Sequence, residues 1–381
     1  MNIDTLLSAR GQELLARLAA DDITPDLALG TRLRREYPAD LVAAALAQHE
    51  LRLAARAKFS RAMRMLFTRA GLEQSSAERI GRHRARRYEG KKLVADLCCG
   101  IGGDLVTLPA ALAVDRDEVH ARLARFNASI YLTTVQAAVA DVRDLRLNTL
   151  GAVFIDPARR TGGASRPGRR VGRTGTSEPP LEWCFEIPVP AGIKAAPGVD
   201  LGVVPPGWEA EFVADGRDLK EATLWSPAFA TAARRATVLT SDGGEATLLP
   251  SPGDAVPVAA PGEYLLDPNP AVTRAGLVEE LARSADGWKI DDQIAFIAAD
   301  HAVHTPFART LRVLDSAPWN EKDFARRLRA LGIGAADIRR RGLAGDVDQI
   351  RRRLRLDGPR QGLVVLTRVS DKPWGLICQQ V

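Results

Sequence analysis

The stretch "VADLCCGIGGD", residues 94–104, decides the fold of this chain. Apolar residues surround Asp96, and three glycines, Gly100, Gly102 and Gly103, follow before a helical pattern. Glycine has no Cβ, so a backbone that contains it can turn sharply and approach a ligand closely. The stretch predicts a strand, a ligand-binding turn and the start of a helix.

The neighbouring sequence alternates in the same way. The short apolar runs "LAVDRD", "TTVQAAVAD" and "AVFIDP" are separated by helical stretches, and each run ends near an acid. This alternation favours a parallel sheet with crossover helices. Residues 1–90 are predicted to be helical, with one helical pattern running from residue 39 to Gly71. After residue 200, "EAEFVADGRDLKEATLW" and "RATVLTSDGGEATLL" each predict an antiparallel hairpin with a glycine turn.

The glycine turn can be tested against known ligand-binding patterns. A phosphate loop needs Gly-Lys-Ser/Thr, and a dinucleotide fingerprint needs a glycine where Leu105 stands. Asp96 is an unfavourable neighbour for a pyrophosphate, but it can pair with an ammonium group. Asp115, 19 residues later, lies where a second strand presents a carboxylate to ribose hydroxyls, and Asp141 can accept from an adenine amino group. These features favour S-adenosyl-L-methionine (SAM) over an unliganded turn.

At these residues the chain resembles the class I SAM-dependent methyltransferases. The resemblance implies an α/β, Rossmann-like domain over residues 91–250, with a seven-stranded, mostly parallel sheet finished by an antiparallel hairpin. Cys98 and Cys99 lie in the turn and are expected to be small packing residues, because no activating histidine is near them in the sequence. The residues assigned to the cofactor are Asp96, Cys98, Gly100, Gly102, Asp115 and Asp141.

The run "VFIDPARR", residues 153–160, stops at Asp156 and Pro157. It resembles the Asp/Asn-Pro-Pro-aromatic motif of methyltransferases that modify exocyclic amino groups of bases, although Ala158 and Arg159 replace the last two residues. A carboxylate and a backbone carbonyl that accept both N–H bonds would align such a nitrogen for in-line attack. Asp156, Pro157 and Arg159 are therefore the predicted catalytic residues. The alternative is that Asp156 only caps the following turn.

A second Asp-Pro pair, Asp267-Pro268, lies outside this α/β unit. We interpret it as the approach to a helix, with Asn269 as its cap and Pro270 in its first turn.

The chain carries 53 basic and 47 acidic residues, a formal net charge of +6, which suits a polyanionic partner. Basic clusters occur at residues 82–92, 159–173 and 339–355. The second is a glycine-rich loop with six arginines directly after Asp156, so it can contact phosphates beside the pocket, or it can be a solvated loop. Trp183 offers an aromatic surface for a base, or belongs to the core. The residues assigned to the substrate are Arg160, Arg166, Arg169, Arg170 and Trp183.

The last segment, residues 306–381, looks like the THUMP-like domain that accompanies a bacterial group of predicted methyltransferases. The resemblance to that group extends to "LEWCFEIP", "IKAAPGVD", "LKEATLW" and "DPNPAVTRAGL". THUMP domains are RNA-binding modules, so the resemblance implies an RNA partner, tRNA or rRNA. The expected divisions are a helical region at 1–90, the methyltransferase domain at 91–250, a linker and helical connector at 251–305, and a small α+β domain at 306–381.

Together these features predict a cytoplasmic, SAM-dependent methyltransferase that acts on an exocyclic amino group in RNA. The four cysteines have neither metal-ligand spacing nor a secreted disulfide framework, and neither a membrane segment nor a metal site is expected. Two alternatives stay open. One is an RNA-binding or scaffolding protein with a vestigial SAM pocket, and the other is a methyltransferase that acts on DNA, protein or a small molecule.

Overall fold

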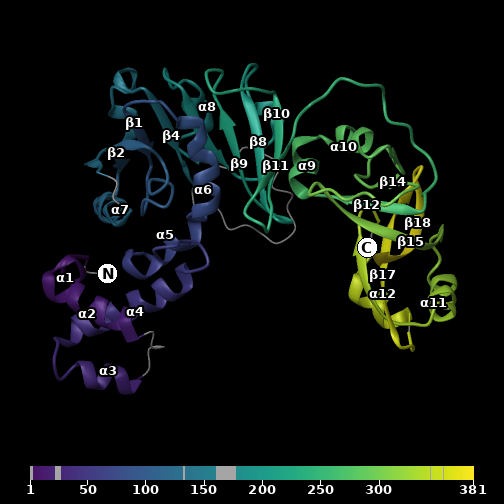
Figure 1. Ribbon diagram of the computed structural model, residues 1–381, viewed down its shortest axis with the longest axis horizontal. Coiled ribbons are helices and arrows are strands. Elements are labelled where there is room, and N and C mark those ends of the chain that lie inside the picture. The colour runs from purple at the N-terminus through teal and green to yellow at the C-terminus, as the bar shows by residue number, and fades with distance from the viewer. Residues whose placement is uncertain (1–2, 22–26, 132–133, 160–176, 344, 355) are drawn as a thin grey trace. The chain divides into compact units, whose positions relative to one another are not determined.

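The structure is a computed structural model that describes residues 3–21, 27–131, 134–159, 177–343, 345–354 and 356–381 (Figure 1). Its described residues form two compact units. The first contains residues 1–209 and 223–231, and the second contains residues 210–222 and 232–381.

The N-terminal region is helical, as the sequence predicts. Its core consists of leucines and aromatic residues such as Leu14 and Phe67. The predicted continuous pattern to Gly71 is wrong, because α4 ends at Ala55. The buried guanidinium of Arg52 donates hydrogen bonds to the carbonyls of Arg64 and Met65, which holds the returning chain against α4. The helices are α1 (Ile3–Leu7), α2 (Ala9–Asp21), α3 (Leu27–Leu33), α4 (Ala39–Ala55), η1 (Ala62–Arg64), α5 (Arg69–Gln74), α6 (Glu78–Ala85) and η2 (Arg86–Tyr88).

A large sheet follows, with the strand order β11-β10-β8-β9-β7-β4-β1-β2-β3. Strands β3, β2, β1, β4 and β7 are parallel, so their carboxyl ends meet at one edge. With β9 between β7 and β8, the arrangement confirms the predicted α/β class, and β10 and β11 extend the sheet beyond seven strands. The strands are β1 (Val94–Leu97), β2 (Ala110–Asp115), β3 (Gln136–Val139), β4 (Ala152–Ile155), β7 (Ala191–Ala195), β8 (Glu209–Asp215), β9 (Asp218–Trp225), β10 (Arg234–Leu239) and β11 (Glu245–Leu248).

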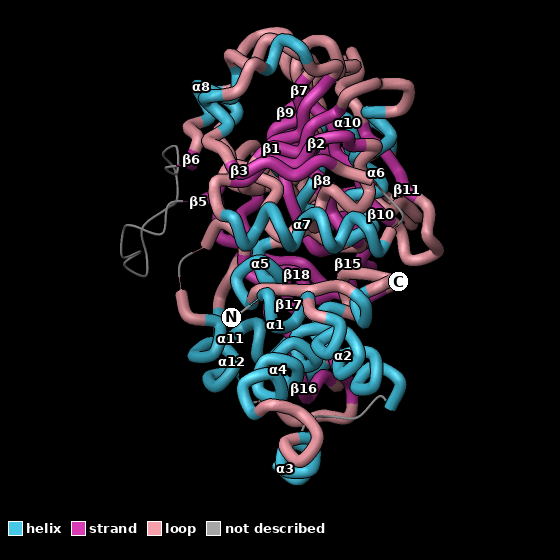
Figure 2. The backbone as a smooth tube through the Cα atoms, turned by 90° about the vertical axis from the view of Figure 1, so that its left-hand side faces the viewer, coloured by secondary structure: helices cyan, strands magenta, loops and turns pink. Residues whose placement is uncertain are grey.

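Short elements connect these strands. Helix α7 (Glu118–Ile130) packs on β2 and β3 and buries Leu123 and Ala124 (Figure 2). The helix predicted directly after the glycine turn is not formed; residues 101–107 make successive turns before β2 begins. Only a few residues separate the glycines from β2, and glycine disfavours a helix interior. The remaining elements are η3 (Val142–Asp144), η4 (Leu147–Thr149), β5 (Ala158–Arg159), β6 (Ser177–Glu178), α8 (Leu181–Phe185) and η5 (Leu201–Val203).

The C-terminal part contains a seven-stranded sheet with the order β13-β14-β12-β15-β18-β17-β16. One apolar cluster joins the sheet to α11 and α12, and a second includes Leu265, Leu311 and Phe296. Asn269 accepts a hydrogen bond as the cap of α9, as the sequence predicts, and Asn320 caps α11 in the same way. The elements are β12 (Tyr264–Pro268), α9 (Pro270–Ala275), α10 (Val278–Ser284), β13 (Trp288–Lys289), β14 (Ile297–Ala299), β15 (Ala308–Pro318), α11 (Glu321–Ala330), β16 (Ile333–Arg340), α12 (Val347–Leu354), β17 (Arg360–Val369) and β18 (Lys372–Gln380).

Candidate functional site

The glycine turn after β1 contains a left-handed segment. The φ angles are 57° at Cys98, 51° at Gly100 and 79° at Gly102. A Cβ on Gly102 would lie 2.8 Å from the Cα of Ala124 in α7, so this glycine is needed for packing. A Cβ on Gly100 would meet nothing within 4 Å. Gly100 therefore borders open space at the strand edge, where a ligand can approach the backbone.

Asp115, at the end of β2, is fixed beside this turn. Its Oδ2 accepts a hydrogen bond from the Gly100 backbone nitrogen at 2.8 Å, and its Oδ1 accepts one from Asp117 at 2.9 Å. The Nδ1 of His120 lies 3.7 Å from Oδ1. Burial alone would raise the pKa of Asp115, but the His120 contact and the two backbone donors lower it below its usual value. The carboxylate is therefore ionised at the edge where the parallel strands end.

Asp96 is buried in β1, with 1% of its surface exposed. Neither carboxyl oxygen has a hydrogen-bond partner among the described residues. Burial raises the pKa of Asp96 well above its usual value, and the negative charges of Asp104 and Asp156 raise it further. A buried carboxyl group without a partner is costly. Its oxygens therefore offer a site for a cationic or hydrogen-bond-donating group.

Asp156, at the end of β4, is paired with a lysine from the neighbouring strand β7. The Nζ of Lys194 lies 2.6 Å from Asp156 Oδ2 and 3.6 Å from Asp104 Oδ2. Asp104 also pairs with the buried Arg84, at 2.5 Å. The side chain of Lys194 is 12% exposed and that of Asp156 is 34% exposed. Lys194 therefore links a buried carboxylate to one that solvent can reach.

The two carboxylates beside Lys194 titrate differently. Burial raises the pKa of Asp156 above its usual value, although the positive charge of Lys194 opposes this. For Asp104, the attraction of Arg84 and Lys194 outweighs burial and lowers the pKa to about 2. Asp104 is therefore ionised at neutral pH, whereas Asp156 binds a proton at a higher pH than Asp104 does.

The segment after Asp156 is described only in part. Pro157 is buried, and strand β5 pairs with β6, with Ala158 opposite Glu178. Of Arg159 the structure describes the backbone. Four of the arginines predicted to contact the substrate, Arg160, Arg166, Arg169 and Arg170, lie outside the described residues.

Asp141 caps the start of η3, after β3, and is held by Arg143. Its Oδ1 accepts hydrogen bonds from the Arg143 backbone nitrogen and from Nε, both at 2.9 Å, and its Oδ2 accepts one from Nη2 at 2.6 Å. The side-chain hydrogen bond from Arg143 lowers the pKa of Asp141 to about 2. The same guanidinium also lies 2.9 Å from Glu178. An amino group that binds Asp141 would therefore have to share its oxygens with Arg143.

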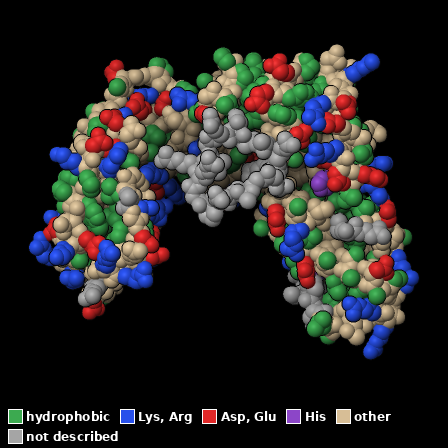
Figure 3. Space-filling view, turned by 180° about the vertical axis from the view of Figure 1, so that it is seen from behind, with side chains coloured by type: hydrophobic (Ala, Val, Ile, Leu, Met, Phe, Trp, Pro, Cys, Tyr) green, Lys and Arg blue, Asp and Glu red, His purple; other side chains and the backbone are tan. Residues whose placement is uncertain are grey.

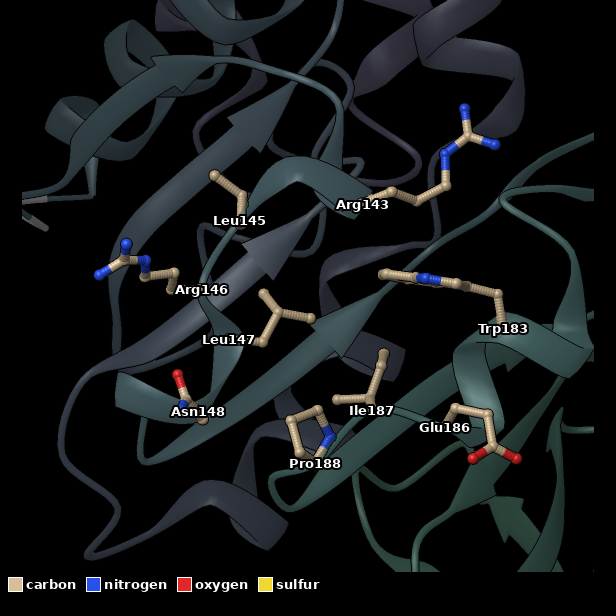
Figure 4. A pocket seen from close by; sticks show the side chains of 9 residues that line it. All are labelled: Arg143, Leu145, Arg146, Leu147, Asn148, Trp183, Glu186, Ile187 and Pro188. Carbon is tan, nitrogen blue, oxygen red and sulfur yellow. The ribbon is translucent and has the colours of Figure 1, made fainter.

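A cavity of about 410 Å³ lies between the segment after β3 and the segment around α8. The predicted substrate residue Trp183 is half-buried in α8, and its indole ring extends across the cavity toward Leu147 (Figure 4). This position allows Trp183 to offer a flat surface inside the cavity. The lining residues are Arg143, Leu145, Arg146, Leu147, Asn148, Trp183, Glu186, Ile187 and Pro188.

The structure thus brings Asp96, Asp104 and Asp156 into one charged cluster and fixes Asp115 beside Gly100. Sequence reasoning missed Asp104, Arg84 and Lys194. A signal was present for Lys194, because a lysine inside the apolar run "AGIKA" of a central strand needs a partner.

The chain matches the family model described as THUMP domain-like over residues 308–380, and a domain of unknown function, DUF8688, over residues 2–55. Uncharacterized S-adenosylmethionine-dependent methyltransferases from two strains of Mycobacterium tuberculosis, CDC 1551 / Oshkosh and ATCC 25618 / H37Rv, are each 37% identical to it over 315 residues. The alignment covers 80% of this chain and 85% of each relative. The crystal structure of a provisionally assigned methyltransferase from Porphyromonas gingivalis W83 has the same fold, with a TM-score of 0.75 and 20% identity over 97% of this chain and 98% of that one.

Within the described ranges, no helix combines the length and the apolar character needed to cross a membrane. The same residues contain no group of three or more His, Cys, Asp or Glu side chains arranged to hold a metal ion.

Proposed function

The chain belongs to the S-adenosylmethionine-dependent methyltransferases of class I fold with a C-terminal THUMP-like domain, and we propose that it methylates an exocyclic amino group of a base in RNA. The observation that carries the proposal is the pairing of Asp156 with Lys194 at the strand edge beside the glycine turn.

The residues at this edge fit the cofactor. The unpartnered carboxyl group of Asp96 can accept hydrogen bonds from the ammonium group of the methionine part. Gly100 leaves room for close approach, and Asp115 is ionised to accept from ribose hydroxyls. Cys98 and Gly102 shape the turn, and they contribute backbone conformation more than side-chain chemistry. When bound, SAM supplies an electrophilic methyl group on a sulfonium ion.

Asp156 is the proposed acceptor for the target amine. Lys194 holds Oδ2, which leaves Oδ1 to accept one N–H of the amine. The Pro157 carbonyl would accept the second N–H, and the fixed φ of proline limits the positions that this peptide can adopt. Two acceptors orient the nitrogen lone pair and stabilise the positive charge that develops on nitrogen as the methyl group arrives. The proton can leave to water afterwards, so a strong general base is not required.

The contacts to the rest of the substrate follow from its chemistry. We propose that Trp183 stacks on a base in the adjoining cavity. Arg159 and the arginines at 160, 166, 169 and 170 would contact phosphates next to the target nucleotide. Asp141 stays the proposed acceptor for the adenine amino group, which it would share with Arg143.

RNA is the proposed substrate class because the C-terminal residues match a THUMP domain-like model and the chain is basic. We propose tRNA or rRNA as the target. All four cysteines are free thiols, which fits a reducing cytoplasm as the site of the reaction.

The test is transfer of labelled methyl from SAM into separated RNA, DNA and protein fractions from cells that lack this gene. We compare the wild type with Asp156→Ala. The matched control is Asp218→Ala, which removes an exposed carboxylate that pairs only locally, with Lys220. We expect label in RNA with the wild type and the control, and its loss with Asp156→Ala.

Other outcomes assign the protein differently. Label in DNA or protein would change the substrate class. A folded wild type that binds SAM but labels none of the fractions would favour the scaffolding alternative. Equal labelling by the wild type and Asp156→Ala would remove Asp156 from the mechanism.

A further inference from the structure

Basic and acidic side chains are interspersed on the face of the molecule in Figure 3, so net charge alone does not locate a binding surface. One group in the second unit differs. Arg217, Arg309, Arg339 and Arg341 all lie around the single carboxylate of Asp267, and we call these four residues the arginine cluster.

Two members of the arginine cluster are hydrogen-bonded to Asp267. Arg217 donates from Nη2 to Oδ2 at 2.9 Å and from Nη1 to the backbone carbonyl at 3.1 Å, and Arg339 donates from Nη1 to Oδ2 at 3.3 Å. The other two are near but not bonded. Arg309 lies 3.7 Å from Oδ2, and Arg341 lies 3.6 Å from Oδ1.

Strands β12 and β15 place two of these charges on one face of the C-terminal sheet. Asp267 follows Leu265 by two residues on β12, and Arg309 precedes Leu311 by two residues on β15, so both lie on the face that carries the apolar cluster of Leu265 and Leu311. Arg341 follows β16 directly, and its guanidinium lies 4.8 Å from the ring centroid of Phe296 in the same cluster. The arginine cluster therefore borders this apolar core.

The assignment of Asp267-Pro268 as only the approach to a helix is thus incomplete. Pro268 does precede the cap Asn269, but Asp267 is 7% exposed and holds arginines from three other segments. Asn269 also donates to the carbonyl of Gly216, which holds the turn that carries Arg217.

The charges in this group do not balance. Asp267 supplies one negative charge for four guanidinium groups. Among the described residues, Asp337 is a further acid near this group, 3.5 Å from Arg339, but its side chain is 62% exposed. One carboxylate neutralises the charge of one guanidinium group, so a net positive charge remains beside Asp267. The four arginines repel one another, although each is also attracted to Asp267.

Unpartnered donors lie among these charges. The Nε of Arg309 and the Nη1 of Arg341 are buried and have no hydrogen-bond partner among the described residues. Burial lowers the pKa of Arg309, and the positive charges of Arg339 and Arg217 lower it further. The unpartnered donors and the lowered pKa of Arg309 both suit a site that binds an anion.

We propose that the arginine cluster binds one backbone phosphate of the RNA, with Asp267 as the residue that positions the guanidinium groups. Planar guanidinium forks suit the tetrahedral oxygens of a phosphodiester, and a buried donor gains most from a charged acceptor. This assignment rests on RNA as the substrate, and it adds a contact in the second unit to those proposed around Asp156.

The test uses the full chain with Arg309 and Arg341 both changed to Gln. These two are chosen because the hydrogen bonds that hold Asp267 come from Arg217 and Arg339 and stay in place. The control changes Arg17 and Arg326 to Gln, which removes the same charge from arginines outside the three basic clusters that pair with Glu36 and Asp323. The Kd for a labelled tRNA transcript is measured over a range of salt concentrations, and kcat and KM for methyl transfer to RNA are measured in parallel.

We expect the cluster variant to bind about 10-fold more weakly and the slope of log K against log salt to fall by about one, as for the loss of one phosphate contact. The control should change Kd by less than about twofold. KM for RNA should rise while kcat at saturation is kept. A second variant with Lys at both positions keeps the charge but loses the forks, so its Kd should lie between those of the wild type and the Gln variant.

The proposal is overturned if the cluster variant, with wild-type circular dichroism, has the Kd and salt slope of the control, or if the wild type does not bind RNA. A different outcome contradicts the function proposed above. In that case the arginine cluster contributes to RNA binding, but the bound RNA receives no methyl group. If the cluster variant methylates RNA with an unchanged KM, the phosphate site is wrong, but the proposed methyltransferase function stands.

Discussion

Lys194 is predicted to control both the stability of the first unit and the charge of Asp156. Lys194→Met removes the ammonium group and keeps an unbranched side chain of similar length. Three carboxylates, at positions 96, 104 and 156, would then have Arg84 as the remaining cation of the cluster.

The distances set the size of the effect. At an effective dielectric constant of about 20, charges separated by the observed 2.6 Å and 3.6 Å attract by about 6 and 5 kcal/mol before desolvation is subtracted. Removing one partner of a buried pair costs about 3–5 kcal/mol. Because Asp156 is 34% exposed, water replaces part of the lost attraction. We therefore expect Lys194→Met to lower the free energy of unfolding by about 2–4 kcal/mol at pH 8.

The pH dependence gives a sharper test than the magnitude. The pKa of Asp156 is already raised by burial, and Lys194 opposes the rise, so its removal should raise that pKa further. An acid with a raised folded-state pKa destabilises the fold as pH rises from the unfolded value toward the folded one. The cost of Lys194→Met should therefore be larger at pH 8 than at pH 5, where Asp156 is more often protonated and needs no counter-ion.

Urea unfolding of the wild type, Lys194→Met and Lys194→Arg at both pH values measures this difference. The pH profile of kcat/KM for methyl transfer should also move to higher pH in Lys194→Met, because in the proposed mechanism the ionised Asp156 accepts from the amine. Arginine should restore most of the stability, since it keeps the charge. If Lys194→Met equals the wild type in stability at pH 8 and in its kcat/KM profile, Lys194 is not the counter-ion of Asp156 and the reasoning is refuted.

Three further changes test the site and its supports. Gly102→Ala should destabilise the fold by about 1–3 kcal/mol, because its Cβ would lie 2.8 Å from the backbone of α7, whereas Gly243→Ala, at an open turn with φ 89°, should cost less; urea unfolding compares them. The pKa of His120 is raised, chiefly by its contact with Asp115, so its stabilising contribution should be present below about pH 6.5 and lost as pH rises through the higher folded value. Thermal unfolding of His120→Ala and the wild type at pH 5.5 and 8.5 should therefore differ more at the lower pH. Asn269→Ala should cost about 1–2 kcal/mol by urea unfolding, because it removes the cap of α9; an unchanged midpoint would contradict the capping role.

Much of the fold was predictable because its signals are local. The glycine turn at 98–103, the alternation of strands and helices, and the cap Asn269 depend on residues within a few positions of one another. The α+β character expected for the C-terminal residues is also confirmed, with β15, α11, β16, α12, β17 and β18 in that order. The helix expected after the glycines is not formed. The segment between the glycines and β2 is too short for one, and this length is fixed by where β2 begins, which the local pattern does not show.

Pairings across the chain were not predictable from local patterns. Lys194 meets Asp156 from 38 residues away, and Arg339 meets Asp267 from 72 residues away. The periodicity of a strand indicates which face a side chain occupies, but it does not indicate which strand lies beside it. The same limit applies to the helical pattern predicted from residue 39 to Gly71. The helix ends at Ala55 and the chain folds back, so that Arg52 binds the carbonyls of Arg64 and Met65, and periodicity does not indicate this contact.

The two Asp-Pro sequences differ in charge balance, and this difference indicates opposite ligands. Around Asp156, three carboxylates share two cations, Arg84 and Lys194, so the cluster has room for one positive charge if all three are ionised. On the proposed function, SAM, with a sulfonium, an ammonium and a carboxylate, would supply that charge. Around Asp267, four arginines share one buried carboxylate, so the local excess is positive and suits a phosphate. Because buried charges are stable only when compensated, the count of counter-ions around each aspartate predicts the sign of its ligand, which the Asp-Pro motif alone does not.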